Sequence, residues 1–291
     1  MMPSDALLTA ADQLELLKLQ VTVKFTRSTR LPPFKGSLLH GWLGQAIQQY
    51  SGDLYYLLFE QHDGSHPKPY SITVGAEQKT QWQTGELYEF GLTLFGEAVQ
   101  VADSVIDALN QYPSKAVNGE ADFALCSVSS LLPNGRMLHG THPYSLAEGL
   151  RDSLAMPAEA ITLSFLTPAR YKLRGNICRT IPDIQFIAQQ GARRLVDLAT
   201  YWAMDEPKLL ALITKQIPRG FVNRVVDNSY YEDWLRFSHK SRRLLPFGGI
   251  KGQIAYEGDL APLLPYLLVG EQLQTGGKTT FGLGQIRVIG G

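Results

Sequence analysis

Residues 270–288 read GEQLQTGGKTTFGLGQIRV, a glycine-rich segment that runs into an alternating strand pattern near the end of the chain. Glycine permits positive φ angles and close approach of a backbone to a ligand, so successive N–H groups of such a segment can line a concave anion site. Lys278 and Arg287 add positive charge. The spacing fits neither the phosphate-binding loop of nucleotide triphosphatases nor the dinucleotide fingerprint. A plain turn is the alternative, and the surrounding sequence has to decide between the two.

Composition places the chain among ordinary globular proteins. It has 291 residues, of which 44% are hydrophobic and 19% charged, enough for one large domain or two smaller ones. The two cysteines, Cys126 and Cys178, do not form a C-x-x-C motif, so we expect no disulfide framework and a reducing, cytoplasmic location. Because no long apolar run and no basic start occur, we expect neither a membrane span nor a signal peptide.

The charge is balanced overall but uneven along the chain. The 27 basic and 27 acidic residues cancel, which alone argues against a nucleic-acid binder. Between residues 165 and 251, however, 15 Lys and Arg face 7 acidic residues, an excess of 8. A solvated helix surface can carry this excess, but if the cations cluster they favour phosphate binding.

Hydrophobic periodicity predicts the order strand, helix, strand, strand, helix, strand twice along the chain. Such an order is typical of the ferredoxin-like βαββαβ unit. We therefore predict an α+β protein of two tandem ferredoxin-like domains, residues 1–150 and 151–291, the second with helical insertions and the glycine-rich loop. The expected strands are 19–25, part of a mixed strand-and-loop region at 53–69, 87–94, 121–128, 160–174 as a long strand or a bent hairpin, 234–238, 249–256 and 280–288. The expected helices are 36–50, with Ser37 as its cap, 97–109, 184–202, 208–226 with a break at 218–220, and 260–268.

Four segments resemble one known family over essentially the whole chain. They read LPPFKGSLLHGWLG (31–44), FGLTLFG (90–96), WLRFS followed by FGGIKG (234–252), and TGGKTTFGLG (275–284). These segments are similar to the CRISPR-associated endoribonucleases of the RAMP superfamily that process precursor crRNA, the sixth Cas protein family. The glycine-rich segment is the most specific of the four. The resemblance implies tandem ferredoxin-like domains, recognition of CRISPR repeat RNA and metal-independent cleavage within the repeat.

The chemistry implied by this resemblance needs no cofactor. The RNA's own 2′-hydroxyl can attack the phosphate, which leaves a 2′,3′-cyclic phosphate and a 5′-hydroxyl end. The protein then has to supply a base, an acid and positive charge for the phosphate. We expect no metal site, although His139 and His142 form an H-x-x-H pair, because no carboxylate or cysteine cluster joins them at ligand spacing.

His40 is the first candidate for proton transfer. We expect it in the first turn of a helix, where N–H groups attract phosphate and favour the neutral imidazole, and the resembled family often places a catalytic His in this region. Lys35, a little over one turn earlier, is a candidate for holding the scissile phosphate, and His239 is the rival base. The plainer alternatives are a hydrogen-bonded His on a helix flank, a solvated loop Lys and a solvated turn around His239.

Further basic and loop residues are candidates for RNA binding. On a helix, adjacent arginines point about 100° apart, so at most one of the pair at 193 and 194 can face a given groove. The candidates are Arg193, Arg194, Arg236, Lys240, Arg242, Gly276, Gly277, Lys278, Thr279, Gly282 and Gly284.

Three functions remain open from the sequence. The leading hypothesis is an endoribonuclease that cuts CRISPR precursor RNA, with or without keeping the product. The first alternative is a catalytically inactive RAMP subunit that binds the crRNA handle in an interference complex. The second is a double ferredoxin-like enzyme or sensor for a small anion. The expected partners are repeat RNA and other Cas proteins, with no membrane and no direct DNA contact.

Overall fold

The structure, a computed structural model, describes residues 3–61, 66–75, 78–112, 122–215, 217, 219–233, 235–238 and 243–290. The chain forms two compact units. One comprises residues 12–149 and 197–205, and the other comprises residues 1–11, 150–196 and 206–291. Neither unit is continuous in the sequence.

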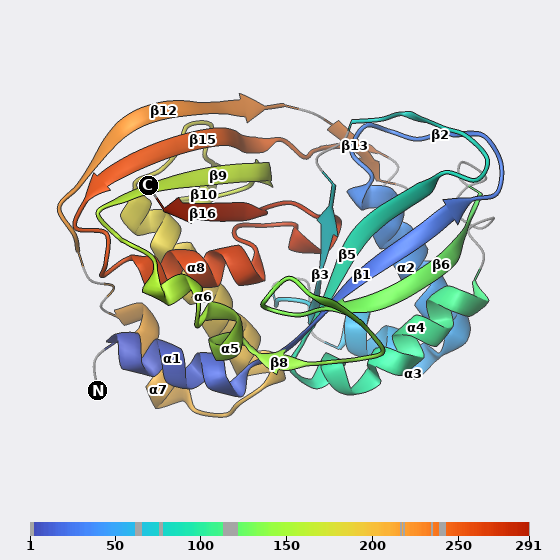
Figure 1. The fold of residues 1–291 in the computed structure, drawn as a ribbon, viewed down its shortest axis with the longest axis horizontal. Helices are drawn as coiled ribbons and strands as arrows, with labels where there is room; N and C mark the ends of the chain where they lie inside the picture. The colour runs from blue at the N-terminus through green and yellow to red at the C-terminus, as the bar shows by residue number, and fades with distance from the viewer. Residues whose placement is uncertain are drawn as a thin grey trace. The chain divides into compact units, whose positions relative to one another are not determined.

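The unit built on residues 12–149 contains a six-stranded antiparallel sheet, in which two of the strands are short. Its strand order is β3-β5-β1-β6-β7, and β8 also pairs with β1. Helices α2 and α4 are the two crossover helices of this unit (Figure 1). The elements are β1 (Glu15–Phe25), α2 (Gly36–Tyr50), β3 (Tyr70–Val74), β5 (Leu87–Phe95), α4 (Ala102–Gln111), β6 (Phe123–Leu131), β7 (Met137–His139) and β8 (Tyr144–Ser145).

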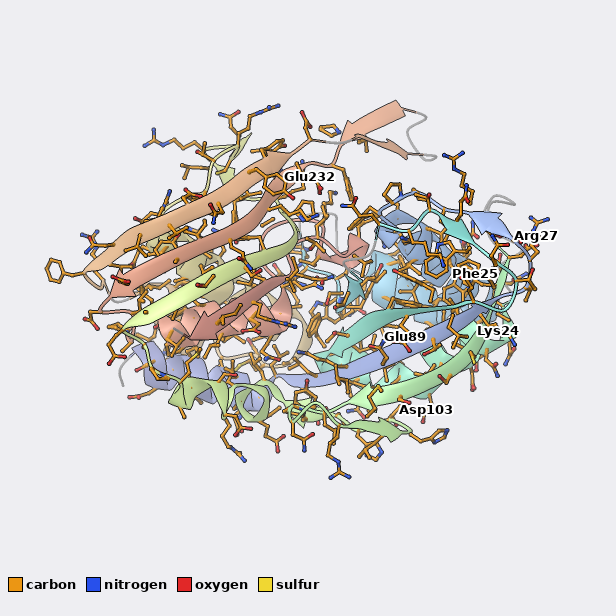
Figure 2. All side chains as sticks on the ribbon, turned by 45° about the horizontal axis from the view of Figure 1, so that its top comes forward. Lys24, Phe25, Arg27, Glu89, Asp103 and Glu232 are labelled. Atoms are coloured by element: carbon orange, nitrogen blue, oxygen red, sulfur yellow. The ribbon has the colours of Figure 1, made fainter. Side chains whose placement is uncertain are left out.

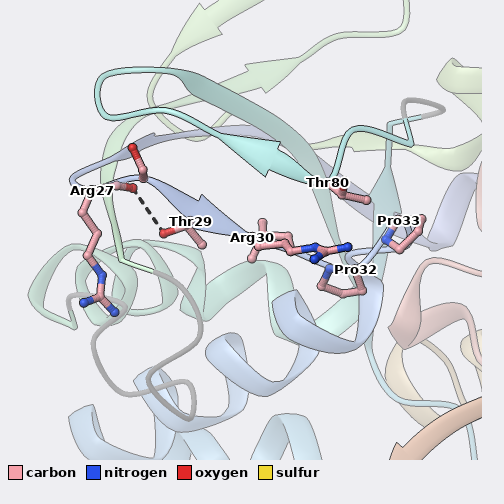
Figure 3. A pocket seen from close by; sticks show the side chains of 8 residues that line it. Arg27, Thr29, Arg30, Pro32, Pro33 and Thr80 are labelled. Atoms are coloured by element: carbon pink, nitrogen blue, oxygen red, sulfur yellow. Dashed lines mark hydrogen bonds between the residues drawn. The ribbon is translucent and has the colours of Figure 1, made fainter.

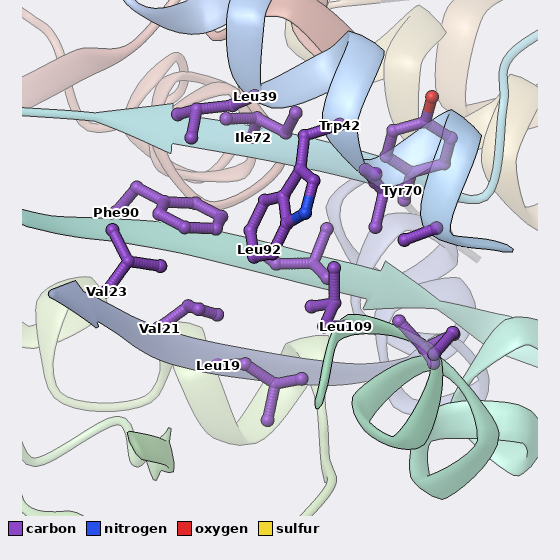
Figure 4. Close-up of a cluster of buried hydrophobic side chains, with 14 of the residues drawn as sticks. Leu19, Val21, Val23, Leu39, Trp42, Tyr70, Ile72, Phe90, Leu92 and Leu109 are labelled. Carbon is purple, nitrogen blue, oxygen red and sulfur yellow. The ribbon is translucent and has the colours of Figure 1, made fainter. Parts of the chain in front are cut away.

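The core of this unit follows from the alternation of β1. Leu19 and Val21 lie opposite Leu92 and Phe90 of β5, so one face of the sheet is continuously apolar. Trp42 of α2 packs onto that face (Figure 4) and contacts the ring of Phe90 edge to face. The Trp42 indole N–H donates to the carbonyl of Tyr112, so this large side chain is buried without an unsatisfied donor.

The second unit repeats the plan with a four-stranded antiparallel sheet. Its strand order is β12-β15-β9-β16, and Figure 1 shows these strands side by side. The elements are β9 (Ala160–Ala169), α6 (Ile184–Trp202), β12 (Val222–Glu232), β15 (Gly249–Gly258), α8 (Leu264–Leu273) and β16 (Ile286–Gly290). In both units the first strand therefore lies between the third and the fourth. The predicted pair of ferredoxin-like folds is confirmed.

Helices α6 and α8 approach each other closely at a glycine. A Cβ atom on Gly191 would lie 2.1 Å from the carbonyl oxygen of Tyr266, and Gly270 is the neighbour on the facing helix. A side chain at this crossing would push the helices apart, because packed backbones cannot yield by that much. The glycine in the middle of helix α6 thus reflects a packing constraint.

The remaining elements are short. They comprise α1 (Pro3–Gln13), β2 (Thr29–Arg30), α3 (Gly52–Tyr55), the π-helix η1 (Tyr56–Glu60), β4 (Gln81–Trp82), the 3₁₀ helix η2 (Gly96–Val101), α5 (Leu146–Leu150), η4 (Ser153–Ala155), β10 (Lys172–Leu173), β11 (Asn176–Ile177), α7 (Pro207–Lys215), β13 (Leu235–Ser238), β14 (Arg243–Pro246) and the 3₁₀ helix η5 (Thr279–Phe281). Among the described residues, no helix combines the length and the hydropathy that crossing a membrane requires.

Several boundaries differ from those predicted. The helix expected over 208–226 ends at Lys215, and residues from Val222 onward form the edge strand β12. The strands at 234–238 and 249–256 were expected to pair with each other, but residues 235–238 pair with β14, and β15 pairs with β12 and β9. Helix α1 was not anticipated, and the closing strand begins only at Ile286. Helix α2 has no side-chain cap from Ser37, because the helix already begins at Gly36.

Candidate functional site

The glycine-rich loop is fixed to the end of strand β9 by backbone hydrogen bonds. The N–H of Gly277 donates to the carbonyl of Arg170 over 3.0 Å, and that of Gly284 donates to Pro168 over 3.1 Å. Thr275 N–H donates across the loop to Gly284 over 2.9 Å. The loop therefore has a defined shape that comes from its own backbone and from β9.

Gly284 is required by this shape. Its φ of +79° lies in the left-handed region, and an added Cβ atom would lie 1.9 Å from the carbonyl oxygen of Thr275. Lys278 also has a positive φ, +70°, and its side chain is exposed beside the exposed Gly277. The rigid part of the loop thus presents a cation at its exposed turn.

The expected row of anion-binding N–H groups needs a correction. The N–H groups of Gly277 and Gly284 are already used by carbonyls of β9, so these two glycines shape the loop and do not offer donors to a ligand. Gly276 and Gly282 have φ angles of +75° and +81°, which likewise serve the turns of the loop. Composition alone could not separate glycines that shape a loop from glycines that expose its amides.

Arg194 supports the loop from helix α6. Its Nη2 donates to the hydroxyl of Thr279 over 3.1 Å, and its Nε donates to the carbonyl of Leu273 over 3.4 Å. Thr279 is buried, so this pair connects the helix to the inner side of the loop. Arg193, one residue earlier, is exposed. The two side chains therefore point to different surroundings, as expected for adjacent positions on a helix. Arg194 contacts the loop, and Arg193 is exposed to solvent.

We predict that Gly284→Ala destabilises the protein by at least about 2 kcal/mol, because a left-handed residue with a Cβ is strained and the backbone must shift. Gly277→Ala is the matched control in the same loop, since its nearest non-local atom would be 3.8 Å from the new Cβ. The control should change stability by less than about 0.5 kcal/mol. Urea unfolding measures both, and equal midpoints for the two variants would contradict the role assigned to Gly284.

His40 lies in a group of aromatic side chains within the other unit. Its Nδ1 is 3.1 Å from the hydroxyl of Tyr70, and the two rings stack with centroids 6.3 Å apart. The ring of Phe59, from the π-helix η1, lies 5.7 Å from that of His40, and Tyr55 stacks on Phe59 at 4.9 Å. The imidazole is half-buried. One nitrogen of the ring is therefore held by a buried phenol.

The Tyr70 hydroxyl keeps its proton at any ordinary pH. Burial, and secondarily the phenol of Tyr55, raises the pKa of Tyr70 well above its usual value. A neutral phenol can both donate and accept, so it can pair with either tautomer of His40. The sequence did not single out Tyr70, because its position beside His40 depends on β3 lying at the edge of the sheet next to helix α2.

The helical position of His40 differs from the expectation. Helix α2 begins at Gly36, which makes His40 the fifth residue and places it beyond the four N–H groups that a helix leaves unpaired. The helix dipole falls off within the first turn, so it contributes little at His40. The hydrogen bond with Tyr70 is the interaction that orients this imidazole.

The expectation that Lys35 holds the scissile phosphate is corrected by its burial. Its side chain is only 1% exposed, and its Nζ donates to the carbonyls of Pro33, over 3.0 Å, and of Lys79, over 2.8 Å. The ammonium also lies 5.6 Å from the ring centroid of Trp82. Lys35 therefore connects two loops of its own unit.

We predict that Lys35→Ala destabilises the protein by about 2 kcal/mol or more, since hydrogen bonds to a charged group are lost and two carbonyls lose their donor. Lys24→Ala is the control, because Lys24 is an exposed lysine of the same unit (Figure 2). Its effect should stay below about 0.5 kcal/mol. Thermal unfolding followed by circular dichroism compares them. If both variants melt like the wild type, Lys35 does not connect the loops as described.

Three of the predicted residues, His239, Lys240 and Arg242, lie outside the described residues. Arg236 belongs to β13, whose backbone pairing with β14 is described while its side chain is not. For the H-x-x-H pair, the structure shows Nε2 of His142 hydrogen-bonded to the carbonyl of His139 over 2.9 Å. The two histidines are thus joined by a hydrogen bond within their own turn.

Comparison with known families gives a match in each unit. Residues 163–286 match the family model described as CRISPR-associated endoribonuclease Cas6, and residues 14–148 match a family model described as an N-terminal domain. The first of these matches covers the strands of the second ferredoxin-like fold and the glycine-rich loop. The resemblance inferred from the sequence is thereby confirmed. Among curated protein sequences, none matches this chain significantly.

Solved structures share the fold over nearly the whole chain. A chain of a partial Cas6-RT-Cas1–Cas2 complex matches with a TM-score of 0.65 at 16% identity, over 94% of this chain and 46% of that one. This chain thus spans about half the length of that relative. Cas6 of Thermus thermophilus matches with a TM-score of 0.56 at 13% identity, over 95% and 99% of the two chains. A RAMP protein that binds different RNA substrates matches with a TM-score of 0.50 at 12% identity, over 94% and 99%.

Proposed function

Because residues 163–286 carry the pattern of the Cas6 endoribonucleases, we propose that this chain cuts CRISPR repeat RNA and so processes precursor crRNA. That family match is the observation that carries the proposal. The fold supports it, since ferredoxin-like units are a common framework for binding single-stranded RNA and hairpin ends. Exposed Lys278 and Arg193 are the cations that we assign to phosphate contacts in the unit that carries the match.

We assign the chemical step to the RNA's 2′-hydroxyl, with the protein moving protons. The 2′-oxygen attacks phosphorus, the bond from phosphorus to the 5′-oxygen breaks, and a 2′,3′-cyclic phosphate and a 5′-hydroxyl result. A base takes the proton of the 2′-hydroxyl, and an acid gives a proton to the departing 5′-oxygen. None of these transfers requires a metal ion, which is why we propose metal-independent cleavage.

His40 is the residue to which we assign proton transfer. We assign the exchanged proton to Nε2, with Nδ1 carrying a proton that it donates to the oxygen of Tyr70. Both the neutral base and the charged acid then keep the same hydrogen bond to Tyr70, so the ring does not have to reorient during the reaction. His239 remains the rival candidate from the sequence.

The first test is cleavage of the cognate repeat RNA in EDTA. We expect the wild type to cut it, and His40→Ala to lower the rate by about 100-fold or more, which is the size of a general acid–base contribution. His139→Ala removes an exposed histidine of the same unit and should cut normally. Wild-type protein that binds the RNA without cutting it would favour the inactive RAMP subunit. Cleavage that survives in His40→Ala would move the chemistry to another residue, with His239 next.

The second test concerns Tyr70. Tyr70→Phe keeps the buried ring and removes the hydroxyl, so we expect cleavage to be about 10-fold slower, because the His40 ring loses the hydrogen bond that orients it. Tyr55→Phe removes a neighbouring phenol of the same aromatic group and should cut at the wild-type rate. Equal cleavage rates for the two variants would contradict the positioning role of Tyr70.

Retention of the product and assembly with other Cas proteins belong to the same proposal. The exposed cations can contact phosphates of the repeat fragment both before and after cleavage, so the fragment can stay bound to the protein. Co-elution of the 3′ or 5′ fragment with the protein on gel filtration tests retention. Competition by free nucleotides at concentrations close to that of the RNA would favour the small-anion alternative.

A further inference from the structure

A pocket opens on the segment between strand β1 and helix α2. Its lining consists of Arg27, Ser28, Thr29, Arg30, Leu31, Pro32, Pro33 and Thr80 (Figure 3). All of these residues belong to the unit that carries His40, and the segment leads directly into its helix. None of these residues belongs to the aromatic group around His40 or to the glycine-rich loop.

The pocket has a rigid frame. Thr29 and Arg30 pair as strand β2 with Trp82 and Gln81 of β4, and the N–H of Leu31 donates to the carbonyl of Thr80 over 2.8 Å. The buried ammonium of Lys35 joins the two ends of the frame through the carbonyls of Pro33 and Lys79. A ligand would therefore meet a preformed surface, which lowers the entropic cost of binding.

The two arginines of the pocket differ in their partners. The guanidinium of Arg27 forms an ion pair with Asp122. Arg30 is exposed, and among the described residues no carboxylate lies within ion-pair distance of it. Figure 3 shows the Arg30 guanidinium beside Pro32, with the Arg27 side chain at the other end of the segment. The pocket therefore presents one cation that is not neutralised by the described part of the chain.

We propose that this pocket, with Arg30 as its anchor and the Thr80 hydroxyl beside it, binds a backbone phosphate of the repeat RNA. The planar guanidinium can donate two parallel hydrogen bonds to phosphate oxygens, and the proline rings give an apolar surface for the adjoining ribose. This contact lies outside the unit that carries the Cas6 match and would hold the strand on the unit that bears His40. The inference rests on the proposed function, because it requires RNA as the ligand.

The test is binding of the cognate repeat RNA by fluorescence anisotropy across a series of salt concentrations. The probe carries 2′-O-methyl groups and so cannot be cut. We expect Arg30→Ala to bind about 10-fold more weakly, as loss of one charge-assisted contact implies. The slope of log affinity against log salt should become shallower by about 0.7, the value for one contact to a single strand. Arg30→Lys should keep the slope and recover part of the affinity.

Arg136→Ala is the matched control, because Arg136 is an exposed arginine of the same unit in the turn before β7. It should bind like the wild type, and thermal melting should show that all three variants are folded. Equal affinity and slope for Arg30→Ala and Arg136→Ala would overturn the inference, while cleavage of unmodified RNA by the wild type in the same preparation would leave the proposed function standing. A wild type that neither binds nor cuts the RNA would overturn both.

Discussion

Each unit depends on one constraint: its first strand, β1 or β9, has to form backbone hydrogen bonds with a neighbouring strand on both sides. β1 pairs with β5 on one side over residues 16–24 and with β6 on the other over residues 19–25, and β9 pairs with β15 on one side and with β16 on the other over residues 161–165. A strand enclosed in this way requires two crossovers, and a helix supplies each of them. The segments that leave the first strand and enter the last strand are thereby fixed in place. They are the segment that carries Arg30 and Lys35 in one unit and the glycine-rich loop in the other.

The fold could be predicted from the sequence because its signals are local and repeated. The alternation of residues 19–25 and the helical spacing of residues 36–50 both hold in the structure. Errors arose where short-range pattern and long-range pairing compete. Residues 222–226 were expected to continue a helix beyond a break at residues 218–220, but in the structure they pair with β15 and belong to a strand. Pairing between strands that are distant in the sequence does not change the spacing of apolar residues within either strand, so that spacing cannot predict the pairing.

The candidate sites were less predictable, for a physical reason. Whether a lysine faces solvent or lies under an aromatic ring depends on residues far along the chain, as the distance in sequence between Lys35 and Lys79 illustrates. Burial of an ammonium is tolerated only when acceptors replace its water, and here two carbonyls do so. Arg30 lies five residues earlier in the same segment and stays in water. Residue type alone could not separate a charge that stabilises a loop from one that is presented to a ligand.

The π-helix η1 has a consequence for how the chain can change in length. Tyr55 and Phe59 stack almost in parallel, with an interplanar angle of 4°, across the wide turn that follows α3. A π turn holds one residue more than an α turn, and each residue of an α-helix turns the chain by about 100°. Deleting one residue here would restore the tighter turn and rotate the Phe59 ring away from His40. The number of residues between Ser51 and Gln61 is therefore as constrained as the identity of those residues. Insertions or deletions would have to fall outside this segment.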